Sequence, residues 1–185
     1  MKIPKTTAYG RVPKPPKEEG EEYGPGKKEI TLCKTCSAVY YHKSWHHNLL
    51  KYDSLEKDKG IFVAMCPACR MKRDGAFEGE VIIENIPKDV REEITRLIQN
   101  IGERAYARDP MDRILSLRSL GKNGLVVHTS ENQLALTIGK EVIMAHKSAK
   151  KSVTLSREES VARVKIDMGG QKTAEQRGRR TAEPR

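Results

Sequence analysis

The chain has 185 residues, of which 37% are apolar and 32% are charged, and its formal net charge at pH 7 is +10. No apolar run approaches the ~20 residues that a membrane-spanning helix needs, so we expect no membrane segment. The first twenty residues contain no hydrophobic stretch of the kind found in a secretory signal. We therefore expect a cytoplasmic protein. In that reducing compartment, paired cysteines bind metal or carry out redox chemistry more often than they form structural disulfides.

Positive charge is concentrated in particular parts of the chain. Residues 31–79 contain 8 Lys and Arg against 5 Asp and Glu, and residues 147–185 contain 11 against 5. Residues 80–146 contain 9 against 10, so the middle of the chain is close to neutral. Uneven basic charge of this kind suits a phosphate backbone or another polyanion, and it is also typical of a solubilising surface with a solvated tail.

Two terminal segments have compositions that favour disorder. Residues 1–29 are rich in Pro, Gly, Lys and Glu, and residues 169–185 are basic and have no apolar side chain larger than alanine. Neither segment has enough apolar surface to offset the entropy lost on ordering. We expect a folded part at residues 30–168, divided into a cysteine-containing zinc ribbon at 30–79 and a second domain at 80–168.

The second domain begins with a strand and a helix. Residues 80–86 have strand composition, and Asp89 is a plausible N-cap for a helix that runs to about Arg108. Apolar residues recur along this helix at the spacing of one buried stripe: Val90, Ile94, Leu97, Ile98 and Ile101. The Asp109-Pro110 pair then ends the helix.

The remaining pattern predicts a hairpin, a second helix and a second hairpin. Asn123-Gly124 is a strong hairpin signal, and Ser130 with Gln133 resembles a capping box that opens a helix to about His146. Leu134, Ile138 and Val142 lie on one face of this helix. Residues 152–156 and 160–166 have strand composition. We predict an α+β fold, in which the ribbon precedes a small, mainly antiparallel sheet with two helices on one face.

Four cysteines form two Cys-x-x-Cys pairs, Cys33 with Cys36 and Cys66 with Cys69. Each pair places two thiolates on one tight turn, and two such turns complete the tetrahedral shell of a structural Zn²⁺. The 29 residues between the pairs exceed the ~15–20 of the common zinc pattern, and they can fold as a separate excursion. The four cysteines are therefore predicted to bind zinc, with iron–sulfur ligation left open by the spacing.

Other interpretations of these cysteines fit the sequence less well. A zinc turn usually has glycine after its second cysteine, and here Ser37 and Arg70 occupy those positions, which indicates looser turns. Thioredoxin-like chemistry needs a lone pair that opens a helix, whereas the chain has two pairs and no clear amphipathic helix after either. His42, His46 or His47 could replace a cysteine at a catalytic zinc, but four thiolates already close the shell.

An all-thiolate zinc site supplies folding energy rather than chemistry, so we expect function on the surface that it shapes. Aromatic faces can stack on bases, and Lys and Arg can contact phosphates. The candidate nucleic-acid-binding residues are Tyr41, Lys43, Trp45, His46, Arg70, Lys72 and Arg73. The alternative is that Tyr40 and Trp45 pack against the cysteine turns as a small core.

Several segments together resemble a known family. "TLCKTCSAVYYHKSWH", "CPACRMKRDGAFEGEVIIENI" and "LVVHTSENQLALTIG" are similar to a family of small, uncharacterised bacterial zinc-ribbon proteins, over about Ile30–Ile166. Those proteins in turn show a distant similarity to the eukaryotic adaptor that exports the large ribosomal subunit. The resemblance implies an RNA- or ribosome-associated zinc protein without enzymatic activity, and it transfers only the four cysteines. Ser37 departs from the glycine common in this family.

Three functions follow from these patterns. The first is RNA binding, with the ribosome as the expected location. The second is a protein-interaction or regulatory module whose ribbon docks on a protein partner, favoured by the near-neutral middle of the chain. The third is an enzyme, for which His128, Asp109 and Asp112 are the nearest candidate groups, but no phosphate loop, nucleophile elbow or carboxylate pair accompanies them. We expect RNA binding without catalysis.

Overall fold

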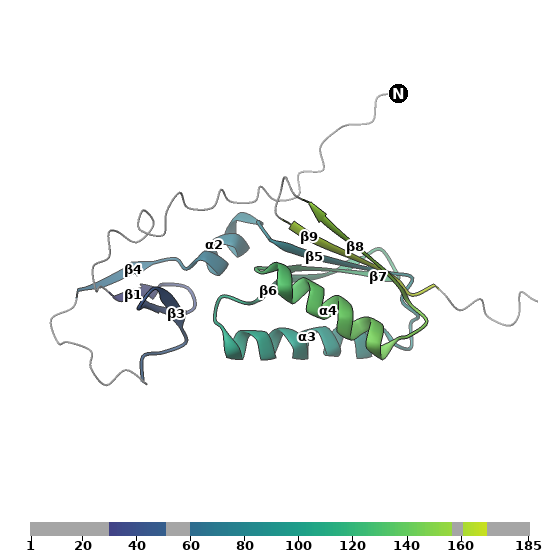
Figure 1. Ribbon diagram of the computed structural model, residues 1–185, viewed down its shortest axis with the longest axis horizontal. Helices are drawn as coiled ribbons and strands as arrows, with labels where there is room; N and C mark the ends of the chain where they lie inside the picture. Colours follow the sequence, from purple (N-terminus) through teal and green to yellow (C-terminus); the bar gives the residue numbers. More distant parts are fainter. Residues whose placement is uncertain (1–29, 51–59, 157–160, 170–185) are drawn as a thin grey trace, which may run out of the picture.

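The computed structural model describes residues 30–50, 60–156 and 161–169. Its described part is α+β, with two mixed sheets and three helices (Figure 1). The predicted disordered segments 1–29 and 170–185 lie outside the described residues. The elements in chain order are β1 (Ile30–Cys33), β2 (Val39–Tyr41), β3 (Ser44–His46), β4 (Ile61–Ala64), α2 (Pro67–Asp74), β5 (Gly79–Glu84), α3 (Arg91–Arg108), β6 (Ile114–Leu120), β7 (Gly124–Thr129), α4 (Asn132–Ala145), β8 (Lys150–Ser156) and β9 (Val161–Asp167).

The smaller sheet carries the cysteines, and we call residues 30–50 and 60–78 the cysteine module. Its strand order is β3-β2-β1-β4, with an antiparallel hairpin between β2 and β3 and a parallel pairing of β1 with β4. The parallel pairing places Cys33, at the end of β1, opposite Ala64, at the end of β4. Both cysteine pairs therefore begin at the same edge of this sheet.

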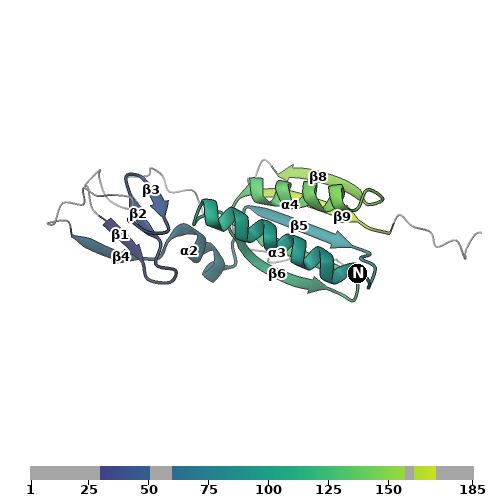
Figure 2. The same ribbon diagram turned by 90° about the horizontal axis from the view of Figure 1, so that it is seen from below.

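The larger sheet has the order β6-β7-β5-β9-β8. Three of its four strand pairings are antiparallel, as the predicted mainly antiparallel sheet requires, and the parallel pairing of β5 with β9 makes the sheet mixed. The β6–β7 hairpin turns before Gly124, as the Asn123-Gly124 signal predicted. Helices α3 and α4 lie side by side on one face of this sheet (Figures 1 and 2).

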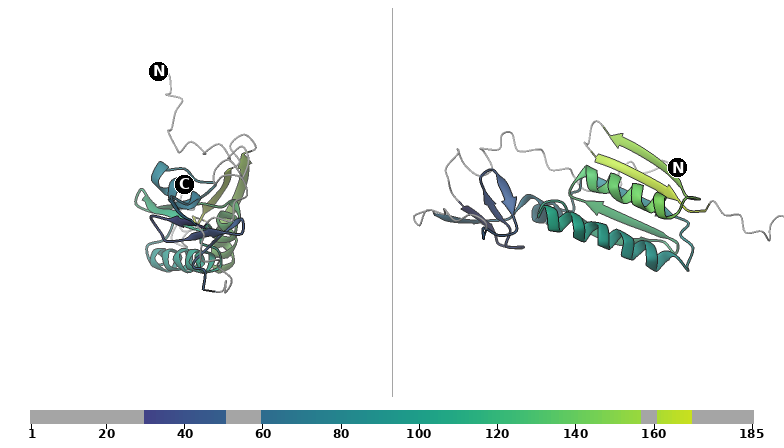
Figure 3. Two further views of the ribbon diagram at one scale, coloured as in Figure 1. Left: turned by 90° about the vertical axis from the view of Figure 1, so that its left-hand side faces the viewer. Right: turned by 60° about the horizontal axis from the view of Figure 1, so that its bottom comes forward.

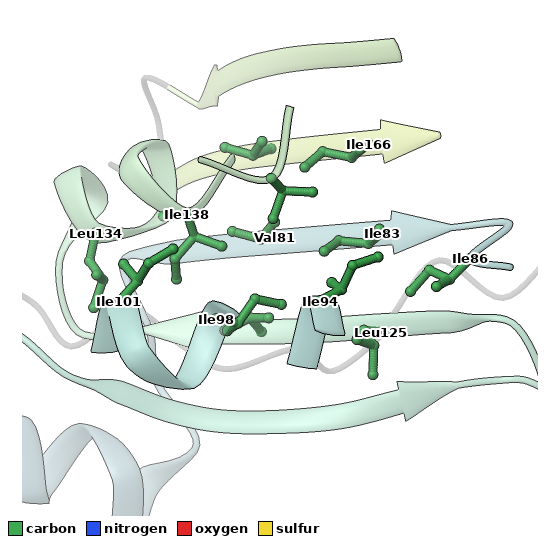
Figure 4. Close-up of a cluster of buried hydrophobic side chains, with 14 of the residues drawn as sticks. Val81, Ile83, Ile86, Ile94, Ile98, Ile101, Leu125, Leu134, Ile138 and Ile166 are labelled. Atoms are coloured by element: carbon green, nitrogen blue, oxygen red, sulfur yellow. The ribbon is translucent and has the colours of Figure 1, made fainter. Parts of the chain in front are cut away.

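Alternation along the central strands supplies the core beneath the two helices. Val81 and Ile83 of β5 and Val127 of β7 are fully buried toward α3 and α4 (Figure 4). The predicted helical stripes meet them through Ile98 of α3 and Ile138 of α4, which are also fully buried. Burying side chains of this size contributes about 1.5–3 kcal/mol each, so this core is sufficient to hold the domain together.

Both predicted helix caps are wrong. Helix α3 begins after Val90 without a side-chain cap, so Asp89 lies one residue too early. Helix α4 begins after Glu131, and the Ser130 hydroxyl instead donates to the Met111 carbonyl at 2.6 Å. A polar side chain before a helix caps it only when no other partner competes, and here the loop before β6 does compete.

Helix α2 was not predicted, and it joins the cysteine module to the larger sheet (Figures 1 and 3). Met71 of α2 packs in a small buried cluster with Ala76, Phe77, Leu115 and Val161. This cluster lies between the module and the ends of β6 and β9. The described residues contain no helix that is long and apolar enough to cross a membrane.

Candidate metal centre

The first cysteine pair lies on a tight turn that follows β1. The Ser37 amide donates to the Cys33 carbonyl at 2.9 Å, and the Cys33 amide donates to the Ala38 carbonyl at 2.7 Å. Ser37 closes the turn with φ of +61°, in the left-handed region that favours glycine. The turn is therefore tight, although Ser37 in place of glycine predicted a looser one. Ser37 adopts the strained left-handed conformation itself.

Replacing Ser37 with glycine is expected to stabilise the module. The left-handed conformation costs an ordinary residue about 1–2 kcal/mol, and the extra freedom of glycine in the unfolded chain offsets part of the gain, so we expect a net increase of about 1 kcal/mol. Trp45 is the only tryptophan and is buried in the module, so its fluorescence during urea unfolding reports the change. Arg70→Gly is the matched control. Arg70 is helical, so this glycine should destabilise the module by about 1 kcal/mol.

The second cysteine pair opens helix α2, which corrects the prediction that no clear amphipathic helix follows either pair. Cys66 is the N-cap, its Sγ accepts from the Cys69 amide at 3.4 Å, and Pro67 occupies the first helical position. Arg70 continues this helix, so no left-handed residue is needed after the second pair. A thiolate at a helix N-terminus is stabilised by the helix dipole.

The four thiols converge on one point. All four Sγ atoms lie within 4.8 Å of one another, and the Cys36 and Cys66 sulfurs are 3.7 Å apart. A tetrahedron of metal–sulfur bonds of about 2.3 Å has edges of about 3.8 Å, so the spacing fits a single metal ion. The 3.7 Å separation far exceeds the ~2.05 Å of a disulfide bond, and all four cysteines are free. The four predicted ligands could therefore hold a metal ion.

Burial and amide hydrogen bonds shift the pKa values of the thiols in opposite directions. Burial, the largest effect at both sites, raises the pKa of the Cys66 and Cys69 thiols above the usual range. Burial acts in the same direction at Cys33, but backbone amides, that of Cys66 foremost at 3.3 Å, lower the pKa of this thiol to about 6. A buried thiol with a raised pKa loses its proton only when a cation compensates the charge, which a bound metal does.

Arg113 supplies a positive charge beside the cysteines, and no motif in the sequence pointed to it. Its Nη2 donates to Cys36 Sγ at 3.2 Å and its Nη1 donates to Cys69 Sγ at 3.6 Å, while its Nε donates to the Pro110 carbonyl. Its backbone amide donates to the Ser130 hydroxyl at 2.7 Å. The larger domain thus holds this guanidinium against one sulfur of each cysteine pair. Burial lowers the pKa of Arg113, but the contact with Cys36 outweighs it and keeps Arg113 charged.

The three histidines near the first pair make other contacts. The His46 ring lies with Nε2 at 3.0 Å from the Tyr41 carbonyl, and the His47 Nε2 lies 2.6 Å from the Tyr106 carbonyl. The His42 ring stacks edge-on against Tyr41. Within the described residues, the group of ligand atoms spaced for a metal contains the four cysteines and no histidine.

Burial corrects part of the predicted nucleic-acid surface. Trp45 is 8% exposed and Tyr41 is 6% exposed, and Trp45 packs with Tyr40 and the cysteines as the module's core. Neither ring offers an open face to a base, because the module has few other large side chains to bury. The remaining predicted residues are accessible: Lys43, Lys72 and Arg73 are exposed, while His46 and Arg70 are half-buried.

Comparisons with known proteins do not assign the chain to a family. No family model, no curated protein and no solved structure matches this chain. Function therefore has to be argued from the residues and their geometry.

The candidate catalytic groups do not form one site. His128 is 5% exposed, its Nε2 lies 3.3 Å from Glu80 Oε1, and its ring stacks on Phe77 with centroids 4.0 Å apart. Asp109 accepts from the Met111 amide, and Asp112 pairs with the Arg108 guanidinium. These contacts account for the three groups within the fold, and in the described part of the chain His128 contacts neither aspartate.

Proposed function

We propose that this chain is a zinc protein that binds RNA through its cysteine module, with the ribosome as its expected location in the cytoplasm and without catalysis. One observation carries the proposal. The four thiols lie within 4.8 Å of one another in the module, and basic side chains around them, such as Lys43 and Lys72, are exposed. The resemblance to zinc-ribbon proteins points in the same direction.

The donor set supports zinc over other metals. Tetrahedral sites of four thiolates are typical of zinc and of iron–sulfur centres, and hard cations such as Mg²⁺ and Ca²⁺ prefer oxygen ligands. A cluster of several irons must fit more than one metal atom between the same sulfurs, whereas the 4.8 Å span suits a single ion. Four protein ligands leave no open position for substrate, which supports a structural role for the metal.

The distribution of charge supports RNA binding at the module. Lys34, Lys43 and Lys72 are exposed around the cysteine turns, so they can reach phosphate groups. On the larger sheet, basic and acidic side chains form ion pairs on the face opposite the helices. Lys165 Nζ lies 2.9 Å from Glu84, and Arg163 Nε lies 3.5 Å from Glu80. Because these pairs neutralise one another, the module is the better surface for a polyanion.

The alternative is a protein-interaction module, and one observation favours it. Strand β4 lies at the edge of the smaller sheet and exposes three consecutive large apolar side chains, Ile61 at 66%, Phe62 at 53% and Val63 at 65%. Exposed apolar edge strands are sites where another chain can add a strand. Such binding would be insensitive to salt, which separates it from RNA binding.

Sedimentation of tagged protein from lysate tests the proposal. We expect the protein to sediment with ribosomes or RNA at about 50 mM salt, to leave that fraction as salt approaches about 500 mM, and to be released by RNase. Lys72→Gln with Arg73→Gln should shift release to lower salt, and Lys140→Gln on α4 is the control with an equally exposed lysine. Protein that stays in the supernatant at low salt, or a salt-insensitive complex with one defined protein, would contradict RNA binding.

A further inference from the structure

A cavity of about 410 Å³ lies between α3 and β6, next to the metal centre. It is lined by Gln99, Gly102, Glu103, Tyr106, Arg113, Ile114 and Leu117. Its volume falls within the range of about 300–1,000 Å³ that is typical of small-ligand sites. Figure 3 shows the end of α3 that borders the module, and the contact between His47 and Tyr106 places the cavity beside that junction.

The floor of the cavity is apolar and depends on one glycine. A Cβ at Gly102 would lie 2.5 Å from Ile114 Cδ1, so glycine is what lets α3 approach β6 this closely. Ile114 and Leu117 of β6 complete the floor. An apolar surface of this kind can take the face of a planar ring.

Tyr106 forms an aromatic wall that is held from two sides. The Arg113 guanidinium lies over its ring at 4.9 Å, and the His47 ring meets it edge-on with centroids 4.7 Å apart. Tyr106 as a residue nevertheless remains 38% exposed, whereas Tyr41 and Trp45 are buried. Tyr106 is therefore a positioned aromatic side chain that can stack on a base.

Two polar side chains, Gln99 and Glu103, line this space. Gln99 and Glu103 are one helical turn apart on α3, which places their Cβ atoms about 5–6 Å from each other. Tyr106 follows Glu103 by three residues, so all three lie on one face of the helix. Among the described residues, neither the Gln99 amide nor the Glu103 carboxylate has a hydrogen bond or an ion pair. The Gln99 amide can donate a hydrogen bond and the Glu103 carboxylate can accept one or two. Together they match the edge of a base that carries one acceptor next to two donors.

We propose that this cavity binds an unpaired guanine base of RNA, an inference that rests on the proposed RNA-binding function. The base stacks on Tyr106, the Gln99 amide donates to its O6, and the Glu103 carboxylate accepts from its N1–H and exocyclic amine. Unpaired bases in RNA are recognised in this way, by stacking together with hydrogen bonds to the Watson–Crick edge. The negative charge of Glu103 disfavours a phosphate here, so the backbone lies on the basic module and the base enters the cavity.

Binding of short RNAs to the full-length, metal-loaded chain tests this site. The probes are the pentamers UUGUU, UUAUU, UUCUU and UUUUU, with affinity and backbone amide shifts measured by NMR. We expect UUGUU to bind about 5–10-fold more tightly than UUUUU, because one recognised base contributes about 1–3 kcal/mol in stacking and discrimination. The amides of Gln99, Gly102 and Glu103 should shift with UUGUU.

Two variants separate the site from general RNA binding. Glu103→Gln should reduce the preference for UUGUU to less than about twofold while UUUUU binds as well as before or better. Glu92→Gln removes the same charge from the first turn of α3, away from the cavity, and should keep the preference. If the pentamers bind with equal affinity and shift only module residues, the guanine site is wrong and RNA binding stands. If no pentamer binds at low salt, both proposals fail.

Discussion

Replacing Cys66 with serine is expected to abolish metal binding and unfold the cysteine module. Cys66 is fully buried, caps α2 and is one of the four candidate ligands, so its loss leaves three thiols and a weakened helix start. Binding of a structural zinc contributes about 10–16 kcal/mol in small zinc domains, which exceeds what this small module can otherwise gain from burial. Elemental analysis should show one zinc per chain before the substitution and almost none after it, with Trp45 fluorescence shifted to that of an exposed indole.

The larger domain should survive this substitution, because its core under α3 and α4 is separate from the cluster around the cysteines. Methyl NMR signals of Ile98 and Ile138 should therefore be retained. Thr35→Ala is the control, since Thr35 is exposed between the first two ligands and its loss leaves all four sulfurs in place. Full zinc content in Cys66→Ser together with an unchanged Trp45 spectrum would remove the four-cysteine assignment.

Replacing Arg113 with methionine is expected to weaken metal binding by about 10–100-fold, the usual effect of losing a group that hydrogen-bonds to metal ligands. Its guanidinium donates to Cys36 and Cys69 and offsets part of the charge of four thiolates. The substitution also removes one of the polar contacts between the module and the larger domain. Competition with a chromogenic chelator measures the affinity.

Arg113→Lys distinguishes the effect of the positive charge on metal affinity from the effect of the two hydrogen bonds to sulfur. A lysine keeps the positive charge but cannot donate to both sulfurs as the planar guanidinium does, so it should restore only part of the affinity. Arg104→Met, an exposed arginine of α3, is the control for the loss of a positive charge and should bind metal normally. Unchanged affinity in Arg113→Met would mean that the sulfurs do not depend on this hydrogen-bond donor.

The sequence predicted those features of the structure that depend on short-range patterns of residues. The spacing of the cysteines identified the four residues that converge, and helical periodicity placed Ile98 and Ile138 in the core. Both signals depend on neighbours a few residues away, where the chain's own geometry decides the outcome. Local patterns could not predict the parallel pairing of β5 with β9, because it joins residues 83 positions apart, such as Gly79 and Ala162.

Other predictions failed for identifiable physical reasons. Ser37 was expected to loosen its turn, but two backbone hydrogen bonds impose the left-handed conformation on a residue that disfavours it. Helix α2 was missed because it has only eight residues, four of them charged, and gains its position from the metal site and the cluster around Met71. Arg113 could not be found from spacing, because it lies 77 residues from Cys36 and 44 residues from Cys69.

The measurement that tests the central claim most directly is the affinity of purified protein for a labelled single-stranded RNA, with and without its metal. Fluorescence anisotropy gives the affinity across a salt series. The metal-loaded protein should bind with an affinity that falls as salt rises, with a slope of about −2 for three phosphate contacts. Removing the metal should lower the affinity at least about tenfold, because the module then no longer holds its basic side chains in place. Binding that is absent at low salt, or that is unchanged after metal removal, would contradict an RNA-binding surface organised by the metal.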